Sequence, residues 1–151
     1  MIASMRKTFL WIARIFFSLL FIYAGVGKLM NWEGTVNGLV LTFSEWQMHL
    51  EGAILKKDVH NMLASSANII MGVPVGLELI GALLIFLGFK MRIGAAILLL
   101  FLIPVTIIMH PFWFNVGTEL QRELSVFLKN LSLIGALLYI VLTPSAKRTV
   151  Q

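Results

Sequence analysis

Four long apolar stretches constrain the fold of this chain more than any other feature of its sequence. They cover about residues 8–29, 68–89, 92–110 and 124–143. Roughly 20 predominantly apolar residues cross the hydrocarbon core of a bilayer as a helix. In none of the stretches do apolar and polar residues alternate as in a barrel strand. In lipid, helices are therefore the structure in which their backbone groups can form hydrogen bonds. The sequence therefore predicts an all-α integral membrane four-helix bundle, with residues 1–151 forming one transmembrane domain.

The composition supports a place in a bilayer. Of the 151 residues, 59% are hydrophobic and 13% are charged, whereas soluble globular domains carry about 25% charged residues. A soluble domain of this size could not bury so much apolar surface, so the surplus is expected to face lipid. The sequence contains no cysteine, which excludes disulfides, a thiol nucleophile and thiolate-bound clusters or zinc.

The first apolar stretch has the basic leading residues of a signal peptide, Arg6 and Lys7. Its length, its internal Arg14 and its ending at Gly25-Val26-Gly27-Lys28 argue against cleavage, because that ending is not a small-x-small site. We therefore expect it to remain as the first span.

Basic residues are distributed unevenly between the two sides that four spans define. The side shared by both termini and the turn between the second and third stretches carries no acid and six basic residues: Arg6, Lys7, Lys90, Arg92, Lys147 and Arg148. The other side carries three basic residues and six acids. Because cytoplasmic loops are enriched in Lys and Arg, the sequence predicts both termini in the cytoplasm.

The outer segment between the first two stretches, residues 31–66, is too polar to cross the bilayer. It carries a helical apolar stripe made of Val36, Leu39, Val40, Phe43, Leu50 and Ile54. Such a stripe is typical of an amphipathic helix at the interface, where Trp32 and Trp46 would also be stable. The segment is either a simple cover over the outer mouth of the bundle or a lid over a ligand cavity, and the stripe by itself favours the cover.

Two charged residues lie deep within the first two stretches. Glu78 is near the middle of the second, and Arg14 lies a few residues inside the first. Ionisable groups in lipid are costly and usually face a partner or a cavity, and a lone carboxylate would tend to take up a proton. At about 1.5 Å per residue the two groups differ in depth by roughly 8 Å. We expect them to pair, either as a lock between helices or as part of a proton- or ligand-binding site.

A second polar group is expected at the outer ends of the spans. It comprises Lys28, His110, Lys129 and Asn130, with aromatic residues directly after the histidine. These side chains could bind a flat ligand with a polar head, such as a quinone, or serve as ordinary interface anchors. No catalytic residue is assigned. The candidate ligand-binding residues are Arg14, Lys28, Glu78, His110, Lys129 and Asn130.

Other chemistries find little support in the sequence. His49, His60 and His110 have no pairing at metal-ligand spacing, so no metal site is expected. There is no phosphate-binding loop, dinucleotide fingerprint or nucleophile elbow, and the basic residues indicate topology rather than binding of nucleic acid. Gly72 and Gly76 form a small-x-x-x-small motif that would allow a homo-oligomer.

Several short motifs, in their order and spacing, resemble one known family. They are Phe21-Ile-Tyr-Ala-Gly-Val-Gly-Lys-Leu29, Leu77-Glu-Leu-Ile-Gly-Ala82, Leu87-Gly-Phe-Lys-Met-Arg92, His110-Pro-Phe-Trp113 and Leu128-Lys-Asn-Leu131. Over about residues 10–142 this set resembles the DoxX family of small bacterial four-helix membrane proteins. The resemblance implies a bundle in the bacterial inner membrane. Relatives include a subunit of a thiosulfate:quinone oxidoreductase, and others are linked to membrane redox complexes.

Three functions are compatible with these features. The first is a membrane subunit of, or partner to, an oxidoreductase complex, with quinone as the ligand. The alternative is a non-enzymatic membrane scaffold or small-ligand-binding protein, and a transporter would require oligomerisation. Because the chain has no cysteine and no flavin motif, we expect no redox centre or cofactor of its own apart from a bound quinone.

Overall fold

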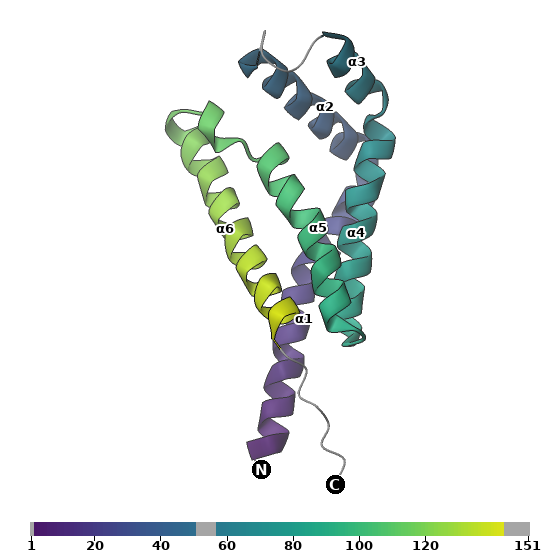
Figure 1. Ribbon diagram of the computed structural model, residues 1–151, viewed down its shortest axis with the longest axis vertical. Helices are drawn as coiled ribbons and strands as arrows, with labels where there is room; N and C mark the ends of the chain where they lie inside the picture. The colour runs from purple at the N-terminus through teal and green to yellow at the C-terminus, as the bar shows by residue number, and fades with distance from the viewer. Residues whose placement is uncertain (1, 51–56, 144–151) are drawn as a thin grey trace.

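The computed structural model describes residues 2–50 and 57–143 (Figure 1). Its elements are α1 (Ile2–Met30), α2 (Trp32–His49), α3 (Lys57–Ser65), α4 (Ala67–Leu87), α5 (Met91–Met109), the 3₁₀ helix η1 (Phe112–Phe114) and α6 (Gly117–Leu142). Within these two ranges there is no strand. The helices α1, α4, α5 and α6 are long and apolar enough to cross a membrane, which confirms the predicted four-span helical fold.

The four long helices pack in the order α1, α4, α5, α6, so α1 and α6 form the two edges of the bundle. The start of α1 and the end of α6 lie at the same end, while α2, α3 and the α5–α6 connection lie at the other (Figure 1). Arg92 at the start of α5 donates a hydrogen bond to the Thr143 carbonyl just beyond α6. The predicted span from residue 124 is part of a longer helix that begins at Gly117.

A tight turn joins α4 to α5 and makes them an antiparallel hairpin. Gly88 caps α4 with a φ of 70°, and Lys90 precedes α5 with a φ of 45°, both in the left-handed region. Closer to the middle, a Cβ on Gly81 would lie 2.9 Å from the Gly94 carbonyl oxygen, and one on Gly94 would lie 2.9 Å from the Gly81 carbonyl oxygen. The hairpin is therefore held by direct backbone contact, which small residues allow between helices in lipid.

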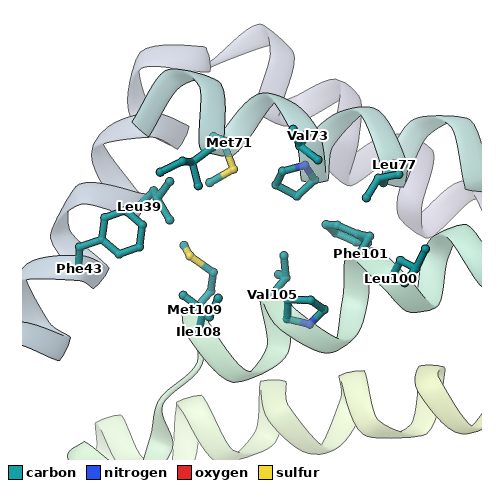
Figure 2. Close-up of a pocket in the computed structure, with 13 residues that line it drawn as sticks. Leu39, Phe43, Met71, Val73, Leu77, Leu100, Phe101, Val105, Ile108 and Met109 are labelled. Carbon is teal, nitrogen blue, oxygen red and sulfur yellow. The ribbon is translucent and has the colours of Figure 1, made fainter. Parts of the chain in front are cut away.

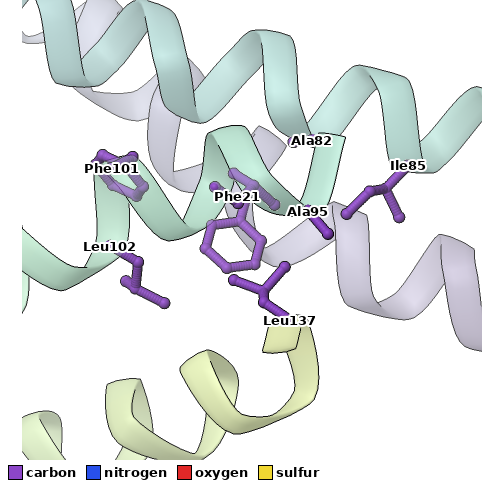
Figure 3. Packing of buried hydrophobic residues seen from close by; sticks show 8 residues of the cluster. Phe21, Ala82, Ile85, Ala95, Phe101, Leu102 and Leu137 are labelled. Atoms are coloured by element: carbon purple, nitrogen blue, oxygen red, sulfur yellow. The ribbon is translucent and has the colours of Figure 1, made fainter. Parts of the chain in front are cut away.

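The main core lies where all four long helices meet. Phe21 from α1 and Leu137 from α6 pack in one buried cluster with Ala82, Ile85, Ala95, Leu98, Phe101 and Leu102 (Figure 3). Many other large apolar side chains remain exposed, for example Phe16 at 72% and Leu100 at 68%. In a membrane these residues face lipid, so their exposure carries no cost there.

The helix α2 covers the end of the bundle away from the start of α1 and the end of α6 (Figure 1), which the sequence predicts to be the outer end. Val36 and Leu39 of the predicted stripe are buried with Ala67, Met71 and Val75 of α4, and Val40 and Phe43 pack beside them. Ile54 lies outside the described residues. The indole Nε1 of Trp32 donates to Asn68 Oδ1 at 3.0 Å, and that of Trp46 donates to the Ile108 carbonyl at 2.9 Å. These bonds tie α2 to the outer ends of α4 and α5.

An aromatic cluster joins α2 to the connection between α5 and α6. Trp46 meets Phe114 and Trp113 edge to face, with ring centroids 5.1 and 5.9 Å apart. The His49 ring stacks on Phe114 at 4.3 Å. The cluster makes the outer cap continuous with the loop that carries the polar residues of the candidate site.

Candidate functional site

Five of the six candidate residues line a single cavity of about 160 Å³ between α1, α4, α5 and α6. They are Lys28, Glu78, His110, Lys129 and Asn130. The remaining walls are apolar and include Phe21, Phe101 and Leu102 from the core. Residues that are up to 102 positions apart in the chain, from Lys28 to Asn130, therefore meet in the outer half of the bundle.

An ion pair between α1 and α4 forms one wall of the cavity. Lys28 Nζ lies 2.6 Å from Glu78 Oε2, and the Glu78 side chain is 3% exposed. Gly25 has no side chain, and this lets α1 approach α4 closely. A Cβ at this position would lie 2.6 Å from Leu79 and 3.6 Å from Glu78 Oε2. The Lys28 ammonium also lies 5.2 Å from the Phe101 ring centroid, a cation–π distance. Lys28 thus supplies the cation that a carboxylate inside a membrane requires.

The predicted pairing of Arg14 with Glu78 is wrong. The register of α1 against α4 places Gly25 opposite Leu79 and Arg14 opposite Gly88. Gly88 follows Glu78 by ten residues, about 15 Å along a helix. The prediction placed the two spans at the same depth. In the structure Lys28, near the end of α1, lies beside Glu78 near the middle of α4, so Arg14 lies at the far end of the bundle from the cavity.

A second acid–base pair closes the outer side of the cavity. His110 Nδ1 lies 2.8 Å from Glu123 Oε2, and Glu123 Oε1 lies 2.9 Å from an Arg122 guanidinium nitrogen. Binding of a carboxylate at Nδ1 orients the imidazole and leaves Nε2 for another partner. Sequence reasoning counted Glu123 as an outer acid and missed this role. Glu123 could have been found from its position in the sequence, since it lies in the second turn of α6, directly across the short connection from His110.

The α6 wall of the cavity supplies two donors. The Asn130 residue is 6% exposed, and its amide makes no hydrogen bond with any side chain or backbone group in the described ranges. Lys129, the neighbouring residue, has no acidic partner there either. A buried amide normally has a hydrogen-bond partner, so Asn130 is positioned to bind a group that enters the cavity.

The cavity can therefore hold a small molecule that carries hydrogen-bond acceptors. The ammonium groups of Lys28 and Lys129 and the amide of Asn130 are hydrogen-bond donors. The imidazole of His110 can donate or accept a hydrogen bond. Among the residues that the structure describes, no group of three His, Asp or Glu side chains is placed to hold a metal ion. The arrangement of donors suits recognition of carbonyl or similar oxygens.

A second cavity, of about 260 Å³, lies between α2, α4 and α5 and is lined by apolar side chains (Figure 2). Leu39 and Phe43 of α2 form one wall, facing Met71 of α4 and Met109 of α5 (Figure 2). The predicted cover thus lies over apolar space and not over the polar cavity. Phe101 lines both cavities and separates them.

Fold and site together define a small multi-pass helical membrane protein with a half-open cavity that five polar or charged side chains line. The DoxX family model matches residues 9–111, so the chain belongs to the DoxX family. It is also similar to the inner membrane protein YphA of Escherichia coli (strain K12), with 32% identity over 138 residues that cover 91% of this chain and 84% of YphA. No solved structure matches the chain. The protein is accordingly a multi-pass inner-membrane protein, and its α6 donors lie beyond the part that the family model matches.

Proposed function

We propose that this protein binds the head of a quinone-class ligand in the polar cavity and serves as a membrane subunit of, or partner to, an oxidoreductase complex. The observation that carries the proposal is that Lys129, Asn130 and His110 line one half-open cavity. A quinone ring is flat and carries two carbonyl oxygens, and these accept hydrogen bonds from such donors.

The size and position of the cavity support a headgroup rather than a whole ligand. Its volume of about 160 Å³ is below the ~300–1,000 Å³ of sites for drug-sized molecules. Leu20 lines the cavity and is also 43% exposed, so an apolar tail could leave between α1 and α6 towards lipid. The chain has no cysteine and no flavin motif, so electrons would come from a partner protein.

We also propose that both termini are cytoplasmic. The start of α1 and the end of α6 lie at one end of the bundle (Figure 1). The basic residues Arg6, Lys7, Lys90 and Arg92 all belong to that end, and the Lys- and Arg-rich side of a membrane protein is usually cytoplasmic.

Quinone content of the purified protein tests the ligand. The wild-type protein, extracted in mild detergent, should retain quinone that mass spectrometry quantifies per protein. His110→Ala and Lys129→Ala should each lower that content about tenfold, the loss expected for one charge-assisted hydrogen bond. Lys7→Ala is the matched control, since Lys7 is an exposed lysine of α1 far from the cavity, and it should retain the wild-type content.

Two results would count against the proposal. Unchanged quinone in both cavity variants would remove the site assignment. A wild-type protein that carries other proteins but no quinone, and shows no spectral change on reduction, would favour the alternative, a non-enzymatic scaffold or small-ligand-binding protein.

A further inference from the structure

The side chain of Arg14 has no hydrogen-bond partner, although part of it is buried. Its Nε and Nη2 atoms are shielded from solvent and unpaired. Its Cζ atom lies 4.0 Å from the centroid of the Trp11 ring, which holds the guanidinium flat by a cation–π contact. A guanidinium carries five N–H donors and no acceptor, so an arginine left in this state at the edge of a membrane requires an anion.

The turn between α4 and α5 provides the space in which this guanidinium lies. A Cβ on Gly88 would overlap Arg14 Nη1, and Gly88 also has a φ of 70°. The absence of a side chain at Gly88 therefore leaves room for the guanidinium between the turn and Trp11. The site is formed by three parts of the chain: the first half of α1, the end of α4 and the turn.

No acid of the described residues lies at this end of the bundle. Glu78 is paired with Lys28. The other acids of the described residues lie on α2, on α3 and at the start of α6, at the opposite end: Glu33, Glu45, Asp58, Glu119 and Glu123. The sequence after residue 143 contains no Asp or Glu. The part of the chain that the structure describes therefore offers Arg14 no anion, and a lipid or solvent anion can take that place.

The level of Arg14 in the bundle indicates which anion is available. It lies opposite Gly88, where α4 ends and α5 begins, and α6 also ends near this level because Arg92 reaches the Thr143 carbonyl. Three of the four spans thus reach the polar headgroup layer there. We propose that Arg14, with Trp11 and the Gly88 turn, binds the phosphate of an anionic phospholipid in that leaflet. Nη1 is the guanidinium nitrogen that is not shielded, so it is the donor that first meets a phosphate oxygen, and a turn of the side chain brings a second N–H to the same phosphate. Basic pockets between membrane helices are known to bind such headgroups.

Native mass spectrometry of the protein in detergent, titrated with phosphatidylglycerol, tests this site. The wild-type protein should bind one phosphatidylglycerol with saturable affinity, and Arg14→Gln should weaken that binding about tenfold. Arg6→Gln is the matched control, because Arg6 is an exposed arginine of the same helix, and it should change the affinity less than about twofold. Arg14→Lys keeps the charge but not the planar fork, and it should bind with intermediate affinity.

Three outcomes would overturn the proposal. They are equal phosphatidylglycerol binding by wild type and Arg14→Gln, equal binding of phosphatidylcholine and phosphatidylglycerol by wild type, and displacement of the lipid by excess inorganic phosphate, which would assign the site to a soluble anion. If Arg14→Gln does not fold, the comparison of wild type with Arg14→Lys decides. Because the ligand and the cavity of the quinone proposal are at the other end of the bundle, either proposal can fail without the other.

Discussion

Glu78 shows how the environment of one residue depends on the helix beside it. A carboxylate at its depth in the membrane needs a cationic partner. Two basic residues of α1, Lys28 and Arg14, lie at different heights along the bundle. The antiparallel register of α1 and α4 brings Lys28 to 2.6 Å from the carboxylate and leaves Arg14 opposite Gly88. The close approach at Gly25 sets that register, because a larger side chain there would collide with Leu79.

Removing one partner of this ion pair should destabilise the protein. Lys28→Met leaves a buried carboxylate unpaired, and we expect a loss of roughly 2–4 kcal/mol in the free energy of unfolding, since breaking buried pairs costs about 3–5 kcal/mol and Lys28 is partly exposed. The double variant Lys28→Met/Glu78→Leu should recover most of that loss. Denaturant unfolding in detergent, followed by circular dichroism, measures Lys28→Met, Glu78→Leu and the double variant.

Lys129→Met is the control for this pair, since Lys129 has no acidic partner in the described ranges. It should change stability by no more than about 0.5 kcal/mol. The pair is not coupled if the double variant loses as much free energy of unfolding as the two single variants together, within about 0.5 kcal/mol.

At the scale of elements, the α4–α5 hairpin depends on two glycines, whereas two other glycines of α4 have open space where a side chain would be. A Cβ at Gly81 or Gly94 would meet backbone oxygen at 2.9 Å, but one at Gly72 or Gly76 would meet nothing within 4 Å. Among the described residues, no neighbouring helix packs closely against the small-x-x-x-small motif in α4. Glycine spacing alone does not distinguish a packing glycine from one that faces lipid or a second copy of the chain.

Adding a single methyl group at these positions should separate the two classes. Gly81→Ala should destabilise the protein by about 1–3 kcal/mol because it overpacks the hairpin. Gly76→Ala, on the same helix, should be neutral or stabilising by up to about 1 kcal/mol through its better helix propensity. The same unfolding measurement compares them, and an equal effect of the two changes would contradict the backbone contact.

At the scale of the whole molecule, an even number of spans places the start of α1 and the end of α6 at one end of the bundle, away from α2 and α3 (Figure 1). The basic residues then determine which end is cytoplasmic. The cap formed by α2 and α3, the polar cavity and the His110–Glu123 pair would all belong to the outer half of the membrane.

The absence of cysteine makes this orientation easy to measure. Ser4→Cys on α1 and Ser65→Cys on α3 are conservative changes at exposed positions. In intact cells or right-side-out vesicles, a membrane-impermeant maleimide should label Ser65→Cys and should label Ser4→Cys only after the membrane is opened. Labelling in the reverse order would contradict cytoplasmic termini.

The sequence by itself determined the helical class, the four spans and most of the residues around the polar cavity. These follow from local properties, because lipid forces each apolar stretch to satisfy its own backbone and makes each charge within it conspicuous. Only the tertiary structure decided which of those residues meet. The axial register and rotation of neighbouring helices joined Lys28 to Glu78, added Glu123 beside His110 and moved Arg14 to the other end of the bundle. Register and rotation depend on contacts such as Gly25 against Leu79 and Gly81 against Gly94, which link positions far apart in the chain and leave no periodic signature in either helix alone.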